Sequence, residues 1–287
     1  IIEEGLEKDI FQEDEDGSIY VDFENGKYPS AIIKRNDGST LYLSRDVANV
    51  KKRANEGFDC NIIVVANEQD LHFQQLFEIA EMFGIENIQN EHISYGLVHL
   101  QDGSMSSSEG NVIKLSDMMD KAVEKAAEVE QRSVDNAEEV GLGAIRYANL
   151  SVSRSKDIEF DWGDVLDFEG DSGPYLQYTN VRAKSILRET EKEGELVGKL
   201  TEDEYRLVKK LGEFPEKVET AADQREPAKI ANYLSTLSEE FNSFYHSCQV
   251  TGVEKETEKR RVEIVESFVK VTDQGLELLG IEPLNEM

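Results

Sequence analysis

Apolar residues follow two different periods along the chain, and the change falls near residue 130. Before it, Asn61–Ala66 and His92–Leu100 have the composition of strands in a parallel sheet that is covered on both faces. Between them, apolar side chains recur at helical spacing until Gly84 ends the helix. These side chains are Leu71, Leu76, Ile79, Ala80 and Phe83. The pattern predicts a βαβ-type half-sheet.

A hairpin and a helix are predicted ahead of this half-sheet. Ala31–Lys34 and Thr40–Leu43 flank the turn residues Asn36–Gly38, a combination that is typical of a β-hairpin. Ser44 or Asp46 then has the side chain needed to cap the next helix.

After residue 130 the apolar spacing is helical almost throughout, which predicts a bundle. Ser116 is expected to cap a helix just before this point, and residues 160–173 are expected to form a loop. The expected helical segments of the second part cover about 135–153, 175–193, 202–223, 227–247 and 255–279, and Pro215 and Pro227 are expected to break the later ones. The prediction is therefore an α/β domain over residues 1–130, followed by an all-α domain over residues 131–287.

The composition is strongly acidic, with 60 Asp and Glu residues against 31 Lys and Arg residues and a net charge of -29. Because 39% of the residues are hydrophobic and periodic, this indicates a folded protein with an acidic surface. Salt screens such self-repulsion, which favours a halophilic source, expected to be an archaeon; the alternative is an ordinary acidic cytosolic protein. Cys60 and Cys248 are interpreted as buried thiols, and no apolar run is long enough for a membrane helix. The start at Ile1 favours an N-terminally truncated chain.

Polar side chains gather where the predicted strands meet helices. Tyr42 closes a strand and Asp46 opens a helix, where a carboxylate can bind a cationic ligand; the simpler interpretation is an N-cap. Gln69 and His72 follow the next strand, and a structural histidine is the simpler interpretation of His72. Ligands of open α/β sheets bind at the carboxyl ends of strands. These residues therefore predict half of a nucleotide site, without a metal-ligand set.

Three further segments carry candidate chemistry. The Ser-rich loop Gly103–Gly110 can wrap phosphate oxygens, the alternative being a surface turn. Tyr175, Tyr178 and Arg182 fall near one helix face, where they would stack on bases if exposed and pack if buried. Arg260-Arg261 is interpreted as part of a solvated charged face.

Several motifs, taken in order, resemble those of arginyl-tRNA synthetases, which are class I aminoacyl-tRNA synthetases. The motifs are Asp37–Asp46, Glu68–Phe77, His92–Val98, Ser104–Val112, Phe168–Tyr178 and Phe241–His246. The resemblance covers nearly the whole chain but only the carboxyl-terminal half of such an enzyme. It implies the second half of a Rossmann-type catalytic domain followed by a helical anticodon-binding domain.

The resemblance also implies roles for the candidate residues. L-arginine would be contacted by Tyr42, Asp46 and Gln69, with Asp46 paired to the guanidinium group. ATP would lie beside His72, Gly96, Leu97 and Val98. A signature loop that stabilises the leaving pyrophosphate would be formed by Ser104, Met105, Ser106, Ser107 and Ser108. The family has Lys-Met-Ser-Lys-Ser there, so Ser replaces both Lys residues.

The helical half would bind arginine tRNA. The implied tRNA contacts are Tyr175, Tyr178, Arg182, Asn242 and Tyr245. Phosphate contacts normally dominate such binding, which conflicts with the net charge. Arg182, Lys184 and Arg188 would offer a local basic patch.

The implied reaction has two steps. The arginine carboxylate attacks the α-phosphate of ATP, whose phosphates carry Mg²⁺, and the terminal ribose hydroxyl of the tRNA then takes the arginyl group. A His-Ile-Gly-His-type signature is not found, which predicts that this chain alone is inactive. The protein is expected to be a cytoplasmic monomer without a membrane partner. The alternatives are a non-catalytic tRNA- or RNA-binding relative and an acidic protein-interaction module.

Overall fold

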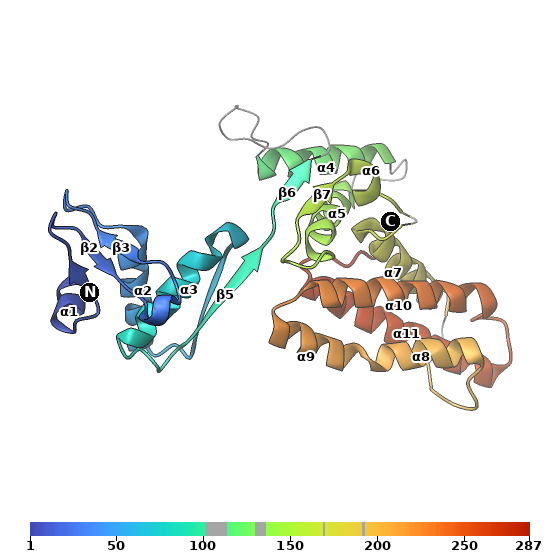
Figure 1. The fold of residues 1–287 in the computed structure, drawn as a ribbon. Coiled ribbons are helices and arrows are strands. Elements are labelled where there is room, and N and C mark those ends of the chain that lie inside the picture. The colour runs from blue at the N-terminus through green and yellow to red at the C-terminus, as the bar shows by residue number, and fades with distance from the viewer. Residues whose placement is uncertain (101–113, 130–135, 169, 191–192) are drawn as a thin grey trace. The chain divides into compact units, whose positions relative to one another are not determined.

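The structure is a computed structural model that describes residues 1–100, 114–129, 136–168, 170–190 and 193–287 (Figure 1). The chain divides into two compact units, Ile1–Gly96 and Leu97–Met287. Among the residues described, none of the helices combines the length and the apolar content that a membrane crossing requires.

The first unit contains the predicted βαβ arrangement. Its elements are α1 (Ile2–Glu7), β1 (Gln12–Glu13), β2 (Ile19–Val21), the 3-10 turn Glu24–Gly26, β3 (Ala31–Lys34), α2 (Tyr42–Glu56), β4 (Cys60–Ala66), the 3-10 turn Asn67–Gln69, α3 (Asp70–Met82) and β5 (Gln89–Tyr95). β4 and β5 pair in parallel, α3 connects them, and α2 packs against α3. β1, β2 and β3 form an antiparallel sheet. Gly84 has a left-handed backbone (φ 75°) just after α3, as expected of a residue that ends a helix.

The helix α2 replaces one strand of the expected hairpin. The turn forms, but only a single bridge joins Lys34 to Thr40, and the strand expected over Thr40–Leu43 is wrong. The reason lies in the apolar spacing, which is already helical from the first turn of α2. The buried apolar residues of α2 are Leu43, Val47, Val50 and Ala54.

One face of β4 is not covered within the first unit. Ile63 and Val65 pack on the unit's core, whereas Ile62 and Val64 on the opposite face are 45% and 62% exposed. Leu71, expected in the core, is also exposed. The strand expected over His92–Leu100 is interrupted, because β5 ends at Tyr95 and a new strand begins at Val98.

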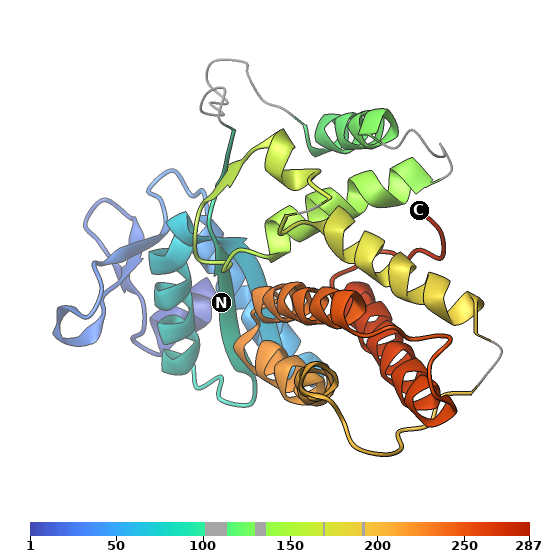
Figure 2. The same cartoon turned by 90° about the vertical axis from the view of Figure 1, so that its right-hand side faces the viewer.

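The second unit is mostly helical, as the apolar spacing predicts. Its elements are β6 (Val98–Leu100), α4 (Leu115–Val129), α5 (Ala137–Leu150), β7 (Ile158–Phe160), α6 (Trp162–Val165), α7 (Gly173–Arg188), α8 (Glu202–Gly212), α9 (Phe214–Gln224), α10 (Ala228–Ser247) and α11 (Lys255–Leu278). Helices α7, α8, α10 and α11 pack around one hydrophobic core, with α10 and α11 side by side (Figures 1 and 2). A smaller core joins α4 and α5 to β7, which pairs in parallel with β6. The domain boundary predicted between residues 130 and 131 lies outside the described residues and stays a prediction.

Two local expectations for this unit are wrong, the Ser116 cap and the continuous loop over 160–173. Ser116 lies inside the first turn of α4 and does not precede the helix as its cap. The expected loop Phe160–Gly173 contains α6, which Asp161 caps. The break expected at Pro215 within the helical segment 202–223 is confirmed, because α8 ends at Gly212 and Pro215 lies in the first turn of α9.

A segment of extended chain after α11 ties the two cores of this unit together. Ile281 is buried in the larger core, and Leu284 is buried in the smaller one. Side chains of α5, of α7 and of the residue before α5 donate hydrogen bonds to the carbonyls of this segment. The bonds are Arg146 to Gly280, Gln177 to Glu282 (2.9 Å), Lys184 to Leu284 (2.9 Å), Arg188 to Asn285 (2.6 Å) and Asn136 to Glu286 (2.8 Å). We call Gly280–Met287 the carboxyl-terminal strap.

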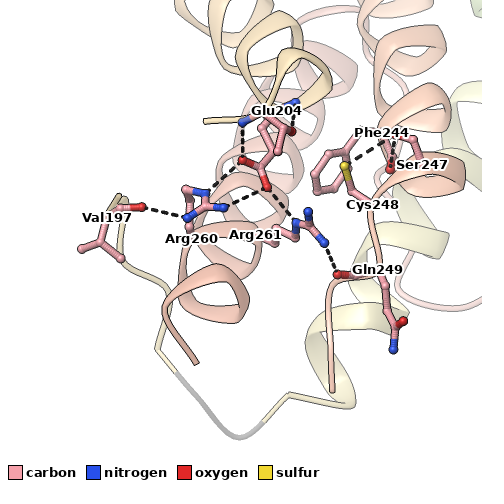
Figure 3. A network of polar contacts seen from close by, with 9 residues as sticks. Val197, Glu204, Phe244, Ser247, Cys248, Gln249, Arg260 and Arg261 are labelled. Atoms are coloured by element: carbon pink, nitrogen blue, oxygen red, sulfur yellow. Dashed lines mark hydrogen bonds and ion pairs between the residues drawn. The ribbon is translucent and has the colours of Figure 1, made fainter. Parts of the chain in front are cut away.

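Arg260 and Arg261 are not the solvated pair that the sequence suggested. Both guanidinium groups point to the carboxylate of Glu204 on α8, and Figure 3 shows this network between α8, α11 and the chain after α10. Arg260 also donates to the carbonyl of Val197, and Arg261 to that of Gln249. The two cations therefore hold together three segments of the helical unit. Cys248 is buried beside this network and Cys60 is half-buried, and both are free thiols.

Candidate functional site

A pocket of about 630 Å³ opens in the first unit, between α2, α3 and the turn before α3. Its lining residues are Tyr42, Asp46, Glu68, Gln69, Leu71, His72 and Gln75. Four residues that the sequence singled out at strand ends, Tyr42, Asp46, Gln69 and His72, therefore line one pocket. The structure brings them together from segments that lie about 30 residues apart in the chain.

Helix α2 contributes Tyr42 and Asp46. Tyr42 is the first helical residue and Asp46 follows one turn later, so both lie on the same face of the helix. Leu41 precedes the helix, and the Ser44 hydroxyl donates to the Leu41 carbonyl at 2.8 Å. Neither Ser44 nor Asp46 is an N-cap, which corrects the simpler interpretation of Asp46. The carboxylate lines the pocket instead, beside a Tyr42 that is 77% exposed.

Helix α3 contributes His72 and Gln75. The Nε2 atom of His72 lies 2.8 Å from Oδ2 of Asp46, which joins the two helices at the pocket. Gln75 is buried and donates from Nε2 to the Pro29 carbonyl at 2.8 Å. Gln75 was not among the predicted site residues, although its position three residues after His72 places it on the same helix face.

The pocket is acidic. Asp46 and Glu68 contribute carboxylates, and none of the described lining residues is Lys or Arg. Glu68 and Leu71 were not among the predicted site residues, although Glu68 belongs to the same polar cluster as Gln69. A site with this charge favours a cationic group, and a carboxylate pairs best with a planar guanidinium.

The other predicted ATP contacts lie at the junction of the two units. Gly96 ends the first unit, and Leu97 and Val98 begin the second. The Leu97 amide donates to Oδ1 of Asp157 at 2.7 Å, and this hydrogen bond lowers the pKa of the Asp157 carboxyl. Val98 pairs with Ile158 across β6 and β7. The signature loop, Ser104, Met105, Ser106, Ser107 and Ser108, lies outside the described residues.

The five predicted tRNA contacts form one cluster on α7 and α10. Nη1 of Arg182 donates to Oδ1 of Asn242 at 2.7 Å, and Nδ2 of Asn242 donates to the hydroxyl of Tyr175 at 2.9 Å. The Arg182 guanidinium lies 4.8 Å from the ring centroid of Tyr178 and 5.2 Å from that of Tyr245. The cluster is packed on itself yet keeps Tyr245 exposed. The side chains of the cluster therefore pack on one another, as the structural alternative expects, and the ring of Tyr245 is exposed, as base stacking requires.

The basic patch expected from Arg182, Lys184 and Arg188 stays a prediction, and one of its three cations has an acidic partner among the described residues. Lys184 is paired with Asp273 at 2.9 Å and donates to the carboxyl-terminal strap, and Arg188 donates to the same strap. The charge of Lys184 is therefore compensated by Asp273, whereas Arg188 donates to a neutral carbonyl and stays exposed.

Two protein-family models match the chain. The family described as "tRNA synthetases class I (R), catalytic domain" matches residues 1–162, and the "DALR anticodon binding domain" matches residues 176–287. The expected order, an α/β catalytic part followed by a helical anticodon-binding domain, is confirmed by these matches.

Curated relatives and solved structures agree with the family models. The chain is 38% identical over 300 residues to the arginine–tRNA ligase of Halothermothrix orenii, and 36% identical over 302 residues to that of Clostridium acetobutylicum. Each alignment covers 100% of this chain and 53% of the relative, so the chain spans about half the length of these relatives.

Among solved structures, the arginyl-tRNA synthetase of Thermus thermophilus superposes with a TM-score of 0.86 at 23% identity, over 100% of this chain and 58% of that one. The enzyme of Plasmodium falciparum gives a TM-score of 0.83 at 22% identity, over 98% of this chain and 51% of that one. At these identities the likeness is one of fold.

Proposed function

Because the chain belongs to the family of class I (R) tRNA synthetases, we propose that it carries out part of the work of an arginine–tRNA ligase. Such a ligase uses ATP to activate L-arginine and transfers it to the 3′ end of arginine tRNA during translation. Since the chain spans about half of its curated relatives, the activity of the whole ligase belongs to this proposal.

The observation that carries the proposal is the carboxylate of Asp46 in an acidic pocket beside Tyr42 and Gln69. In this role Asp46 pairs with the guanidinium of arginine, because two parallel N–H···O bonds fit a planar fork and a carboxylate. Glu68 adds a second negative charge to the pocket. Lysine presents a point charge without the fork, so the pocket favours arginine over lysine.

Calorimetric titration of the 287-residue chain with arginine and with citrulline tests this assignment. Citrulline has the shape of arginine but a neutral ureido group, so arginine is expected to bind at least about tenfold more tightly. Asp46→Asn is expected to abolish the difference. Asp59→Asn, an exposed position outside the pocket, serves as the control and leaves it unchanged. Equal binding of the two ligands by the unaltered chain would contradict the arginine assignment.

ATP is assigned by the same proposal to Gly96, Leu97 and Val98, with Ser104–Ser108 acting on the leaving pyrophosphate; the resemblance also places His72 beside ATP. Among the described residues, no group of three or more His, Cys, Asp or Glu side chains could hold a metal ion. Mg²⁺ is proposed to enter with the ATP phosphates, as the resemblance implies.

Arginine tRNA is assigned to the cluster of Tyr175, Tyr178, Arg182, Asn242 and Tyr245. Base stacking on exposed aromatic rings is less dependent on charge than phosphate contacts are, which suits a chain with a net charge of -29. The same cluster supports the second candidate, a tRNA-binding relative without catalysis.

The proposal also includes the setting of the protein, which is expected to be a monomer in the cytoplasm of a salt-rich cell. The net charge supports the salt-rich setting, because counterions screen the repulsion between acidic side chains. The curated relatives named above are bacterial, so an archaeal source receives no support from them.

A further inference from the structure

The contact between His72 and Asp46 gives the pocket a feature that the resemblance does not assign. Nε2 of His72 and Oδ2 of Asp46 lie 2.8 Å apart, although the two residues are 26 positions apart in the chain. Both side chains are partly buried and both line the pocket. The bond therefore fixes a pocket carboxylate from the neighbouring helix.

A carboxylate that recognises a guanidinium group must be held in one plane. An Asp side chain turns about two bonds, and a bidentate contact forms only when both oxygens face the two N–H groups of the fork. When His72 carries its proton on Nε2, this N–H donates to Oδ2 of Asp46. Oδ1 and one lone pair of Oδ2 then remain for a ligand.

The imidazole of His72 is itself held in place. Its ring meets the buried ring of Phe73 edge to face at a centroid distance of 5.1 Å. Phe73 lies against the ring of His92 at 4.2 Å, and Nε2 of His92 lies 3.0 Å from the Val65 carbonyl at the end of β4. A continuous set of contacts therefore runs from this strand end to the carboxylate of Asp46.

We propose that His72 is a positioning residue for arginine, which holds the carboxylate of Asp46 in the orientation that a guanidinium requires. This inference rests on the proposed function, because it needs arginine in the pocket. It differs from the role that the resemblance implies, in which His72 contacts ATP. The two roles predict opposite results for binding of the two substrates.

Binding of arginine and of ATP is measured with the 287-residue chain and with two variants. His72→Phe keeps an aromatic ring but loses the donor, and it is expected to weaken arginine binding by about tenfold without changing ATP binding. His72→Gln supplies an amide N–H to Asp46 and is expected to restore most of the affinity. His99→Phe removes one of the two described partners of Asp157 in the second unit and is the matched control, with no change in arginine binding.

The results separate this inference from the function on which it rests. If the unaltered chain distinguishes arginine from citrulline but His72→Phe binds arginine equally well, the positioning role is overturned and the function stands. Loss of ATP binding alone would return His72 to the ATP site and overturn the proposal. If the unaltered chain does not distinguish arginine from citrulline, the function and the inference both fail.

A spectroscopic measurement on the unaltered side chain is independent of whether the variants fold. Nitrogen-15 spectra of the imidazole distinguish the two neutral tautomers. Protonation of His72 at Nε2, with a shift of that signal in Asp46→Asn, is expected. A neutral ring protonated at Nδ1 could not donate from Nε2 to Asp46, and that result would overturn the proposal.

Discussion

Glu204 and Arg260 form a buried ion pair that joins α8 to α11. Nε of Arg260 lies 3.0 Å from Oε2 of Glu204, whose side chain has no exposed surface. Arg261 approaches the other carboxylate oxygen, Oε1, at 2.7 Å. One buried carboxylate is therefore shared by two guanidinium groups of α11.

Replacing the carboxylate by an amide is expected to destabilise the protein strongly. Glu204→Gln removes the buried charge that both guanidinium groups share, and removing one partner of a buried pair costs about 3 kcal/mol or more. The free energy of unfolding in urea, followed by circular dichroism, measures the loss. Glu202→Gln alters an exposed residue in the same helical turn and should change stability by less than about 0.5 kcal/mol. Equal stability of the two variants would show that the buried network contributes nothing.

The same pair predicts how stability depends on pH. Burial raises the pKa of the Glu204 carboxyl, but hydrogen bonds from Arg260 and Arg261 outweigh it and leave the pKa below its ordinary value of 4.5. A group whose pKa is lowered by folding stabilises the folded state above its unfolded pKa, and that contribution is lost as the pH falls through the folded pKa. The stability difference between the unaltered chain and Glu204→Gln should therefore be constant above about pH 5 and shrink at lower pH. A difference that grows as the pH falls would contradict this account.

The helices and the βαβ unit could be predicted from the sequence. The spacing of apolar residues, and the Gly and Pro residues that end a helix, are properties of each segment by itself. The partners of charged residues could not be predicted, because they depend on distant parts of the chain. Arg260 looks solvated among its Glu neighbours, and its burial depends on Glu204, 56 positions away. Asp46 has the sequence context of a cap, but the apolar residues of α2 start the helix before it. His72 and Asp46 were both singled out, yet only the packing of α2 on α3 shows that they form a pair.

The carboxyl-terminal strap is expected to stabilise the second unit through its apolar side chains. Leu284 is 5% exposed and packs in the core around α4 and α5, so Leu284→Ala should cost about 2–4 kcal/mol. Leu278→Ala removes the same atoms at a position that is 58% exposed, at the end of α11, and is the matched control. Thermal unfolding of the two variants compares them directly. If both melt alike, the strap lies on the unit without stabilising it.

Tyr245 is expected to be a tRNA contact whose loss leaves the fold intact. It is the exposed ring of the cluster around Arg182, and stacking of a base on an aromatic side chain is worth about 1–3 kcal/mol. Tyr245→Ala should therefore weaken binding of arginine tRNA in molar KCl by about tenfold or more. Tyr205→Ala, an exposed tyrosine on α8, is the control. Identical affinities for the two variants, or equal binding of arginine tRNA and other tRNAs by the unaltered chain, would remove the cluster from the tRNA site.

The close packing of α4 on α5 depends on the absence of a side chain at Gly141. A Cβ atom there would lie 2.7 Å from the backbone nitrogen of Val123 and 2.8 Å from the carbonyl carbon of Ala122, so α4 would have to move away from α5. Gly141→Ala is therefore expected to destabilise the unit by about 1–3 kcal/mol, as overpacking does. Gly212→Ala, at the end of α8, meets no atom within 4 Å and should instead stabilise by about 0.4–1 kcal/mol, because alanine loses less backbone entropy on folding. Urea unfolding of both variants measures two effects of opposite sign. A gain in stability at Gly141 would show that the two helices can separate without loss of packing.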